Sequence, residues 1–146
     1  MIALIQRVNE AEVRVGSERL GAIGRGVLAL IGVQRGDSAE AGARLLERIL
    51  SYRVFPDAVG RMNLSLREVG GGLLLVPQFT LAADTGKGTR AGFSSAAAPE
   101  EAQRLFADLL ARAQGAYAPV SAGVFGAHMQ VSLVNDGPVT FWLETR

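Results

Sequence analysis

The fold depends first on the stretch Gly26-Val27-Leu28-Ala29-Leu30-Ile31-Gly32-Val33, which carries no polar or charged side chain. A continuous apolar run of this kind is typical of a strand buried on both faces of a sheet. A similar run, Leu73-Leu74-Leu75-Val76, follows three consecutive glycines and leads into Pro77. We therefore expect two buried strands.

Two helical segments and several further strands surround these runs. Leucine and isoleucine recur at helical intervals and predict a helix over about Ala39 to Tyr52, where Asp37 and Glu40 have the spacing of a capping box. Pro99 suits the first turn of a second helix, Glu100 to Ala113. The other expected strands cover residues 2–8, 11–15, 124–125, 129–134 and 139–143. Strands interleaved with two helices predict a mixed α+β fold of the broad α/β type, with the helices packed on one side of mixed sheets.

The composition describes one globular domain that spans residues 1–146. Hydrophobic residues make up 49% and charged residues 20%, which excludes a disordered chain. The absence of cysteine excludes disulfides, thiolate nucleophiles and zinc–cysteine sites, and it suits a reducing cytosol. Because the chain has neither a signal peptide nor an apolar run long enough to span a membrane, we expect a soluble cytoplasmic protein.

The net charge is only +1, so a polyanion has to meet a local basic patch. Residues 83–94 contain three glycines together with Lys87 and Arg90, which predicts a mobile basic loop.

Side chains suited to catalysis are scarce. His128 is the only histidine, which excludes a multi-histidine metal site, and the chain has no Gly-x-Ser-x-Gly motif. Thr80 lacks the adjacent base or free N-terminal amine that a threonine nucleophile needs. We therefore expect neither a metal ion nor a cofactor.

Two motifs could act through their backbone instead. In Pro77-Gln78-Phe79-Thr80-Leu81, the N–H groups of Phe79 and Thr80 follow a buried strand and could serve as oxyanion donors. The alternative is an ordinary strand end with Phe79 in the core. In Asn135-Asp136-Gly137-Pro138-Val139-Thr140, a Gly-Pro dipeptide separates two strand-like segments and could present carbonyls to an ammonium group. The alternative there is a simple hairpin turn.

Taken together, the two motifs resemble the two signatures of the D-aminoacyl-tRNA deacylases. The resemblance covers nearly the whole chain, because further matching segments occur in the family's order and spacing. These segments are residues 1–8, 52–55, 62–64, 82–85 and 129–133. The resemblance implies a three-layer α/β/β sandwich that assembles as a homodimer with its sites at the subunit interface. It also implies hydrolysis of the ester that joins a D-amino acid, or a mischarged glycine, to tRNA.

The resemblance assigns the first motif to the reaction centre. Gln78, Phe79 and Thr80 would line it, with the amides of Phe79 and Thr80 facing the ester oxygen, while the 2′-hydroxyl of the terminal adenosine assists the attack of water. Met129 would pack near the adenosine or near the Gly-Pro dipeptide, or would be a plain core residue. Pro77 stands where the family usually has a serine, and it offers neither a hydroxyl nor an N–H.

For the second motif, the resemblance implies a cis Gly137–Pro138 peptide inserted into the pocket of the partner subunit. Its carbonyls would hold the substrate ammonium and occupy the space that an L side chain needs. Arg7 would brace the dipeptide. Lys87 and Arg90 are the expected tRNA contacts.

Two other classes of function stay open. A non-catalytic RNA-binding module would use the loop around Lys87 and Arg90, and it would bind tRNA without turnover. A conventional hydrolase would use Thr80 and His128.

Overall fold

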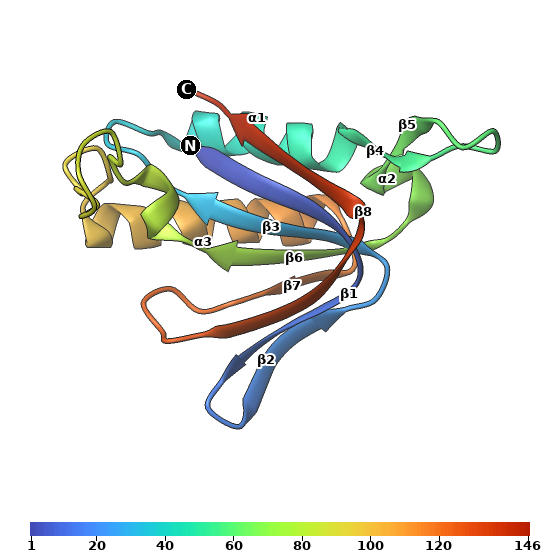
Figure 1. The fold of residues 1–146 in the computed structure, drawn as a ribbon, viewed down its shortest axis with the longest axis horizontal. Coiled ribbons are helices and arrows are strands. Elements are labelled where there is room, and N and C mark those ends of the chain that lie inside the picture. Colours follow the sequence, from blue (N-terminus) through green and yellow to red (C-terminus); the bar gives the residue numbers. More distant parts are fainter.

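The computed structural model describes residues 1–146 and contains a six-stranded mixed sheet, a small two-stranded sheet and helices (Figure 1). The elements are, in chain order, β1 (Ile2–Val15), β2 (Glu18–Ile23), β3 (Gly26–Gly32), α1 (Ala39–Ser51), β4 (Arg53–Pro56), β5 (Met62–Ser65), α2 (Leu66–Val69), β6 (Gly72–Pro77), the 3-10 helix η1 (Phe79–Ala82), α3 (Pro99–Ala116), β7 (Val120–Ala122) and β8 (Gln130–Glu144).

Strand β1 lies in the middle of the main sheet and pairs with three other strands. Its first half pairs with β3 and its second half with β2, while β8 runs antiparallel along its other edge. The strands expected over 2–8 and 11–15 are therefore one strand. The parallel strands β6 and β7 extend the sheet beyond β3. The Ser121 hydroxyl of β7 donates to the carbonyl of Ala22 in β2 at 3.3 Å, so the sheet is nearly closed.

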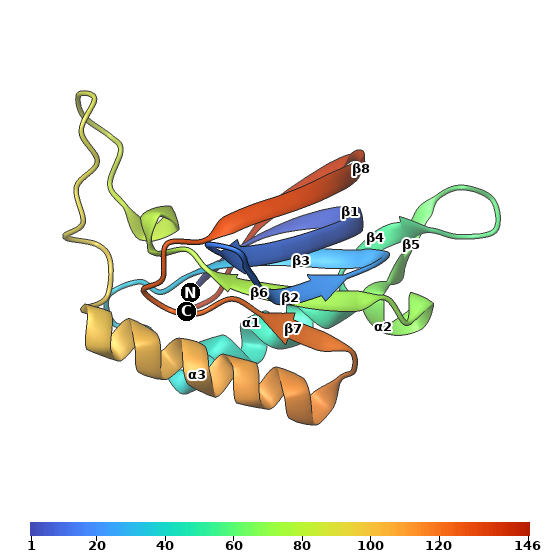
Figure 2. The same cartoon turned by 90° about the horizontal axis from the view of Figure 1, so that it is seen from below.

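Side chains alternate between two cores along the central strands. In β3, Val27, Ala29 and Ile31 join the larger core, whereas Leu28 joins the smaller one. The same alternation divides β6 into Leu73 and Leu75 on one face and Leu74 and Val76 on the other. Figure 2 shows α1 and α3 covering one side of these strands. The smaller core lies on the other side, where residues 8–13 of β1, Ile23 of β2 and the first half of β8 pack over them. This arrangement confirms the three-layer mixed α+β fold with its two long helices on one side.

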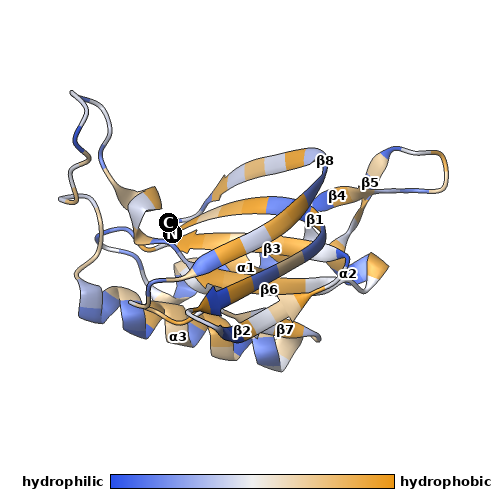
Figure 3. Cartoon of the chain, turned by 60° about the horizontal axis from the view of Figure 1, so that its bottom comes forward, coloured by the Kyte–Doolittle hydropathy of each residue, from blue (hydrophilic) through white to orange (hydrophobic).

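The hydropathy of the strands follows the same layering. Strands β3 and β6 are mostly hydrophobic in Figure 3, and all but one residue of β3 is buried. Polar bands recur along β1, β2 and β8, whose outer faces are partly exposed. The two apolar runs are therefore doubly buried strands, as the sequence predicts.

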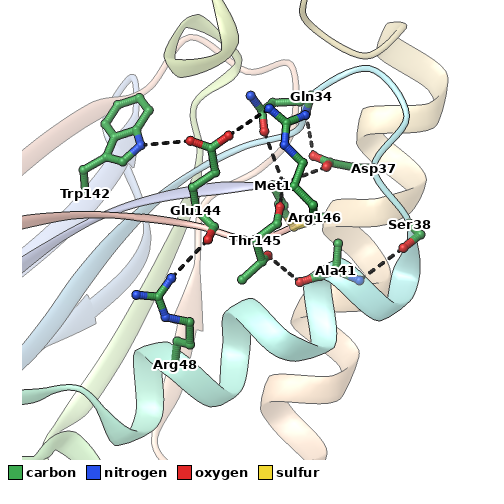
Figure 4. A network of polar contacts seen from close by, with 10 residues as sticks. All are labelled: Met1, Gln34, Asp37, Ser38, Ala41, Arg48, Trp142, Glu144, Thr145 and Arg146. Atoms are coloured by element: carbon green, nitrogen blue, oxygen red, sulfur yellow. Dashed lines mark hydrogen bonds and ion pairs between the residues drawn. The ribbon is translucent and has the colours of Figure 1, made fainter.

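The chain ends meet beside the start of α1. The Met1 ammonium donates to the Asp37 carboxylate at 2.7 Å, and the Thr145 hydroxyl donates to the carbonyl of Ala41 at 2.7 Å (Figure 4). The predicted capping box is wrong, because Asp37 is used in this way. Ser38 caps α1 instead, by accepting from the Ala41 N–H at 3.2 Å.

The end of the chain also differs from expectation. Residues 124–125 are not a strand, and β7 lies earlier, at Val120–Ala122. The strands expected over 129–134 and 139–143 are one strand, β8, because both halves pair with β1. No helix is both long and apolar enough to cross a membrane.

Candidate functional site

The Gly-Pro dipeptide lies in a bulge of β8 rather than in a hairpin turn. Gln6 of β1 pairs with Thr140, and Val8 pairs with Asn135. Between these pairs, β1 contributes only Arg7, whereas β8 contributes residues 136–139. The extra residues cannot all join the ladder, so the strand bulges at Gly137 and Pro138.

Side chains on both sides hold the bulge. The Arg7 Nε donates to the carbonyl of Asp136 at 2.9 Å, and its Nη1 donates to the carbonyl of Val54 at 2.6 Å. The Arg7 side chain is only 12% exposed. At the edge of the bulge, the side-chain Oδ1 of Asn135 accepts from the Val139 N–H at 2.7 Å. The planar guanidinium thus ties the bulge to β4, where its fork reaches two carbonyls at once.

The tip of the bulge is exposed and leaves no room for a larger residue. Gly137 and Pro138 are both exposed, and the peptide bond between them is cis. Gly137 has a φ of +140°, a region that is almost confined to glycine. A Cβ there would lie 2.7 Å from Val139 Cγ2 and 3.3 Å from Arg7 Nη2. The surrounding side chains therefore require glycine at this position.

The first motif forms the corner between β6 and η1. The Gln78 N–H donates to the carbonyl of Ile31 at 2.7 Å, and the first hydrogen bond of η1 runs from Leu81 to Gln78 at 3.2 Å. The N–H groups of Phe79 and Thr80 precede that bond and have no partner within the helix. The Gln78 side chain donates to the Thr80 hydroxyl. The corner therefore presents two free amide donors.

Phe79 does not belong to the core. Its side chain is 56% exposed, and its ring lies 5.3 Å from that of Phe93, measured between centroids. The interpretation of this motif as a strand end with Phe79 buried is therefore wrong.

Met129 lies beside Pro77. Its sulfur accepts from the Val124 N–H at 3.4 Å. A Cβ added to Gly123 would lie 2.7 Å from the Met129 sulfur and 3.4 Å from Pro77 Cδ. The structure thus places Met129 with the β6–η1 corner. It also packs partly against the smaller core, so both the site and the core interpretations fit its position.

The bulge and the corner lie far apart within one chain. Arg7, opposite the bulge, pairs with Val27, and Val27 pairs with Leu73. Pro77 is four residues further along β6, and β6 is three strand positions from β8. Standard strand dimensions give about 13 Å along the strands and about 14 Å across them. A single chain therefore does not bring Gly137 and Phe79 together.

The basic loop projects from the corner (Figure 2). Lys87 and Arg90 are exposed. Asp84 and Gly92 close the base of the loop through two backbone hydrogen bonds of 2.7 and 2.9 Å. His128 is exposed and makes no hydrogen bond with Thr80. No group of three His, Asp or Glu side chains is arranged to hold a metal ion.

Sequence reasoning missed Phe93 and Arg35. Both line a groove of about 590 Å³ beside Phe79. A signal for Phe93 was present, because it is a lone aromatic residue among small and polar ones in a predicted loop. Arg35 carries no comparable signal, because its position beside the corner arises from tertiary structure.

Comparison with known proteins places this chain in a class. A solved chain described as c-Myc DNA Unwinding Element Binding Protein superposes with a TM-score of 0.95 at 38% identity, covering 100% of this chain and 99% of that chain. A protein of Thioalkalivibrio sulfidiphilus (strain HL-EbGR7) named D-aminoacyl-tRNA deacylase is 67% identical, over 99% of this chain and 97% of the relative. One of the same name from Alkalilimnicola ehrlichii (strain ATCC BAA-1101 / DSM 17681 / MLHE-1) is 64% identical, over 100% and 97%. The class is that of hydrolases acting on ester bonds of aminoacyl-tRNA.

The family follows from a match over nearly the full length. The family model described as D-Tyr-tRNA(Tyr) deacylase matches residues 4–144, and the chain belongs to this family. The resemblance drawn from the two motifs is thereby confirmed. The roles of the individual site residues stay predictions.

Proposed function

We propose that two copies of this single-domain chain form a cytoplasmic homodimer that hydrolyses the ester between tRNA and a D-amino acid or a mischarged glycine. Each site would combine the β6–η1 corner of one copy with the β8 bulge of the other. Aminoacylated tRNA would be the substrate, and the reaction would need neither a metal ion nor a cofactor.

The observation that carries this proposal is the separation of two exposed backbone sites. The carbonyl-bearing tip at Gly137 and Pro138 and the free amides at Phe79 and Thr80 lie at different ends of the sheet. Each is incomplete alone, because one offers only acceptors and the other only donors. A second copy that inserts its bulge at the corner would join them in one site.

The bulge would select the substrate. The carbonyls of Gly137 and Pro138 would accept hydrogen bonds from the ammonium group of the amino acid. Because Arg7 and Asn135 hold the bulge in place, it cannot retreat from an L side chain that points toward it. A D side chain would point away, so many D-amino acids would be accepted and L-amino acids would be rejected by exclusion.

The corner would carry the chemistry. Water attacks the ester carbonyl carbon, and the developing oxyanion is stabilised by the N–H groups of Phe79 and Thr80. The C–O bond to the ribose then breaks, and the ribose oxygen takes up a proton. The 2′-hydroxyl of the terminal adenosine would assist the attack, since no side-chain base lies beside Thr80. Gln78 would hold the Thr80 hydroxyl, and Met129 and Pro77 would contact the adenosine.

The test is deacylation of matched D-Tyr-tRNA and L-Tyr-tRNA by the purified protein, with and without EDTA. We expect rapid loss of the D ester alone, unaffected by EDTA. A D-Tyr-tRNA whose terminal ribose lacks the 2′-hydroxyl should react much more slowly. Binding of tRNA without turnover would favour the RNA-binding module, and equal hydrolysis of both esters would contradict the role of the bulge.

A further inference from the structure

A groove continues from the β6–η1 corner along the start of α3. Its volume is about 590 Å³, and the residues that matter here are Arg35, Phe79, Phe93, Pro99 and Glu101. Phe79 belongs both to the corner, through its amide, and to the groove, through its ring. A substrate held at the corner therefore has a direct path into the groove.

The aromatic wall of the groove is exposed and fixed. Phe93 is 47% exposed and stands next to Phe79. Its backbone is tied down on both sides, because Gly92 pairs with Asp84 and the Arg35 N–H donates to the carbonyl of Ser95 at 2.9 Å. An exposed aromatic ring on a fixed backbone is a surface on which a flat ring can stack.

The groove lining carries one positive side chain, Arg35, and one negative side chain, Glu101. The Arg35 guanidinium is exposed and has no acidic partner. The one acidic residue in the groove, Glu101, is paired with Arg104 at 2.6 Å, and this hydrogen bond lowers its pKa. Lys87 and Arg90 are exposed in the loop that precedes Phe93, but they do not line the groove. The groove thus combines a stacking surface with one unpaired cation, Arg35. Single-stranded nucleic acid is bound by aromatic surfaces and cations of this kind.

We propose that the groove receives the single-stranded nucleotides that precede the terminal adenosine of the aminoacyl-tRNA, with a base stacked on Phe93 and a phosphate beside Arg35. This inference rests on the proposed function, because it extends the substrate beyond the adenosine at the corner. The groove is continuous with that corner through Phe79, and its unpaired Arg35 suits a phosphodiester chain better than an apolar protein segment.

The test compares two substrates that share the same reactive ester. D-Tyr-tRNA reaches the groove, whereas D-tyrosyl-adenosine ends at the corner. Phe93→Leu keeps an apolar contact with Phe79 but removes the aromatic ring. We expect it to lower kcat/KM for D-Tyr-tRNA about 10-fold, as the loss of one stacked base does, and to leave D-tyrosyl-adenosine unchanged. Phe93→Trp should restore the rate with tRNA.

A charge variant tests the phosphate contact. We expect Arg35→Gln to lower kcat/KM for D-Tyr-tRNA and to make that rate less sensitive to salt, because one phosphate contact is lost. Arg44→Gln, an exposed arginine on α1 without an acidic partner, is the matched control and should change neither.

Several outcomes would overturn the inference. Equal losses on both substrates would show that Phe93 acts through the reaction centre, and no loss with tRNA would show that the groove holds no RNA. Sedimentation of Phe93→Leu must give the same mass as the parent protein, since dissociation would assign Phe93 to a subunit interface. If the parent protein hydrolyses neither D-Tyr-tRNA nor D-tyrosyl-adenosine, the proposed function is wrong, but the inference about the groove is not yet tested. The groove is then judged by the binding of a fluorescent ACCA oligonucleotide, which Phe93→Leu should weaken about 10-fold.

Discussion

The β8 bulge and the β6–η1 corner both expose backbone groups, but they are held in place differently. Side chains of Arg7 and Asn135 fix the bulge through hydrogen bonds to its carbonyl and amide groups. The corner is fixed by the backbone, since the Gln78 N–H donates to the carbonyl of Ile31. The bulge should therefore be sensitive to residues that never touch the substrate. The corner should be sensitive mainly to the loss of an N–H group.

The largest effect should come from removing an amide at the corner. Phe79→Pro removes an N–H that makes no bond within η1, and the first position of a helix tolerates proline. Loss of one oxyanion donor costs about 100-fold to 1,000-fold in kcat. Phe79→Ala, which keeps the N–H, is the matched variant, and we expect Phe79→Pro to be slower than it by that factor. The rates are measured by single-turnover deacylation of D-Tyr-tRNA. Similar rates for Phe79→Pro and Phe79→Ala would show that the Phe79 amide takes no part in the mechanism.

Adding a single methyl group at Gly137 should displace the tip of the bulge. Gly137→Ala places a Cβ 2.7 Å from Val139 Cγ2 at a φ of +140°, so the tip has to move. A displacement of about 1 Å in a substrate-positioning group lowers the rate about 100-fold. We also expect the free energy of unfolding to fall by about 1–3 kcal/mol, measured by urea denaturation.

Gly16→Ala is the control for backbone strain. Gly16 has a φ of +57°, and a Cβ there meets nothing within 4 Å. This variant should lose some stability but keep its activity. If Gly137→Ala loses no more activity than Gly16→Ala, the bulge does not position the substrate.

A smaller effect should come from the residue that braces the bulge. Arg7→Lys cannot reach the carbonyls of Asp136 and Val54 together, because a single ammonium replaces a fork. Leaving one buried acceptor unpaired lowers the free energy of unfolding by about 1–3 kcal/mol, and we expect about a 10-fold loss of kcat/KM. Arg14→Lys, on the same strand with a partly exposed pair to Glu12, should change little. Equal effects of the two substitutions would make Arg7 an ordinary surface residue.

The same contrast explains what the sequence could predict. The doubly buried strands and both long helices could be predicted from the sequence, because apolar runs and helical periodicity are local signals. The bulge was not, because it arises from the pairing of β1 with both halves of β8, which are more than one hundred residues away along the chain. A Gly-Pro dipeptide alone suits a hairpin equally well. Likewise, the exposure of Phe79 depends on Phe93 and on the start of α3, which no local pattern reveals.

The smallest effect should come from restoring the family serine at the corner. Pro77 ends β6 and lies beside Met129. Because proline restricts the unfolded chain, Pro77→Ser should lower the free energy of unfolding by about 0.4–1 kcal/mol. A new hydroxyl that bonds the adenosine would contribute about 0.5–1.5 kcal/mol, and we expect kcat/KM for D-Tyr-tRNA to rise only about 3-fold. A rise of that size would mean that backbone geometry, which Pro77 leaves intact, provides most of the catalysis at the corner. A far larger rise would make the side chain at position 77 part of the reaction centre, and the corner would then depend on side chains as the bulge does.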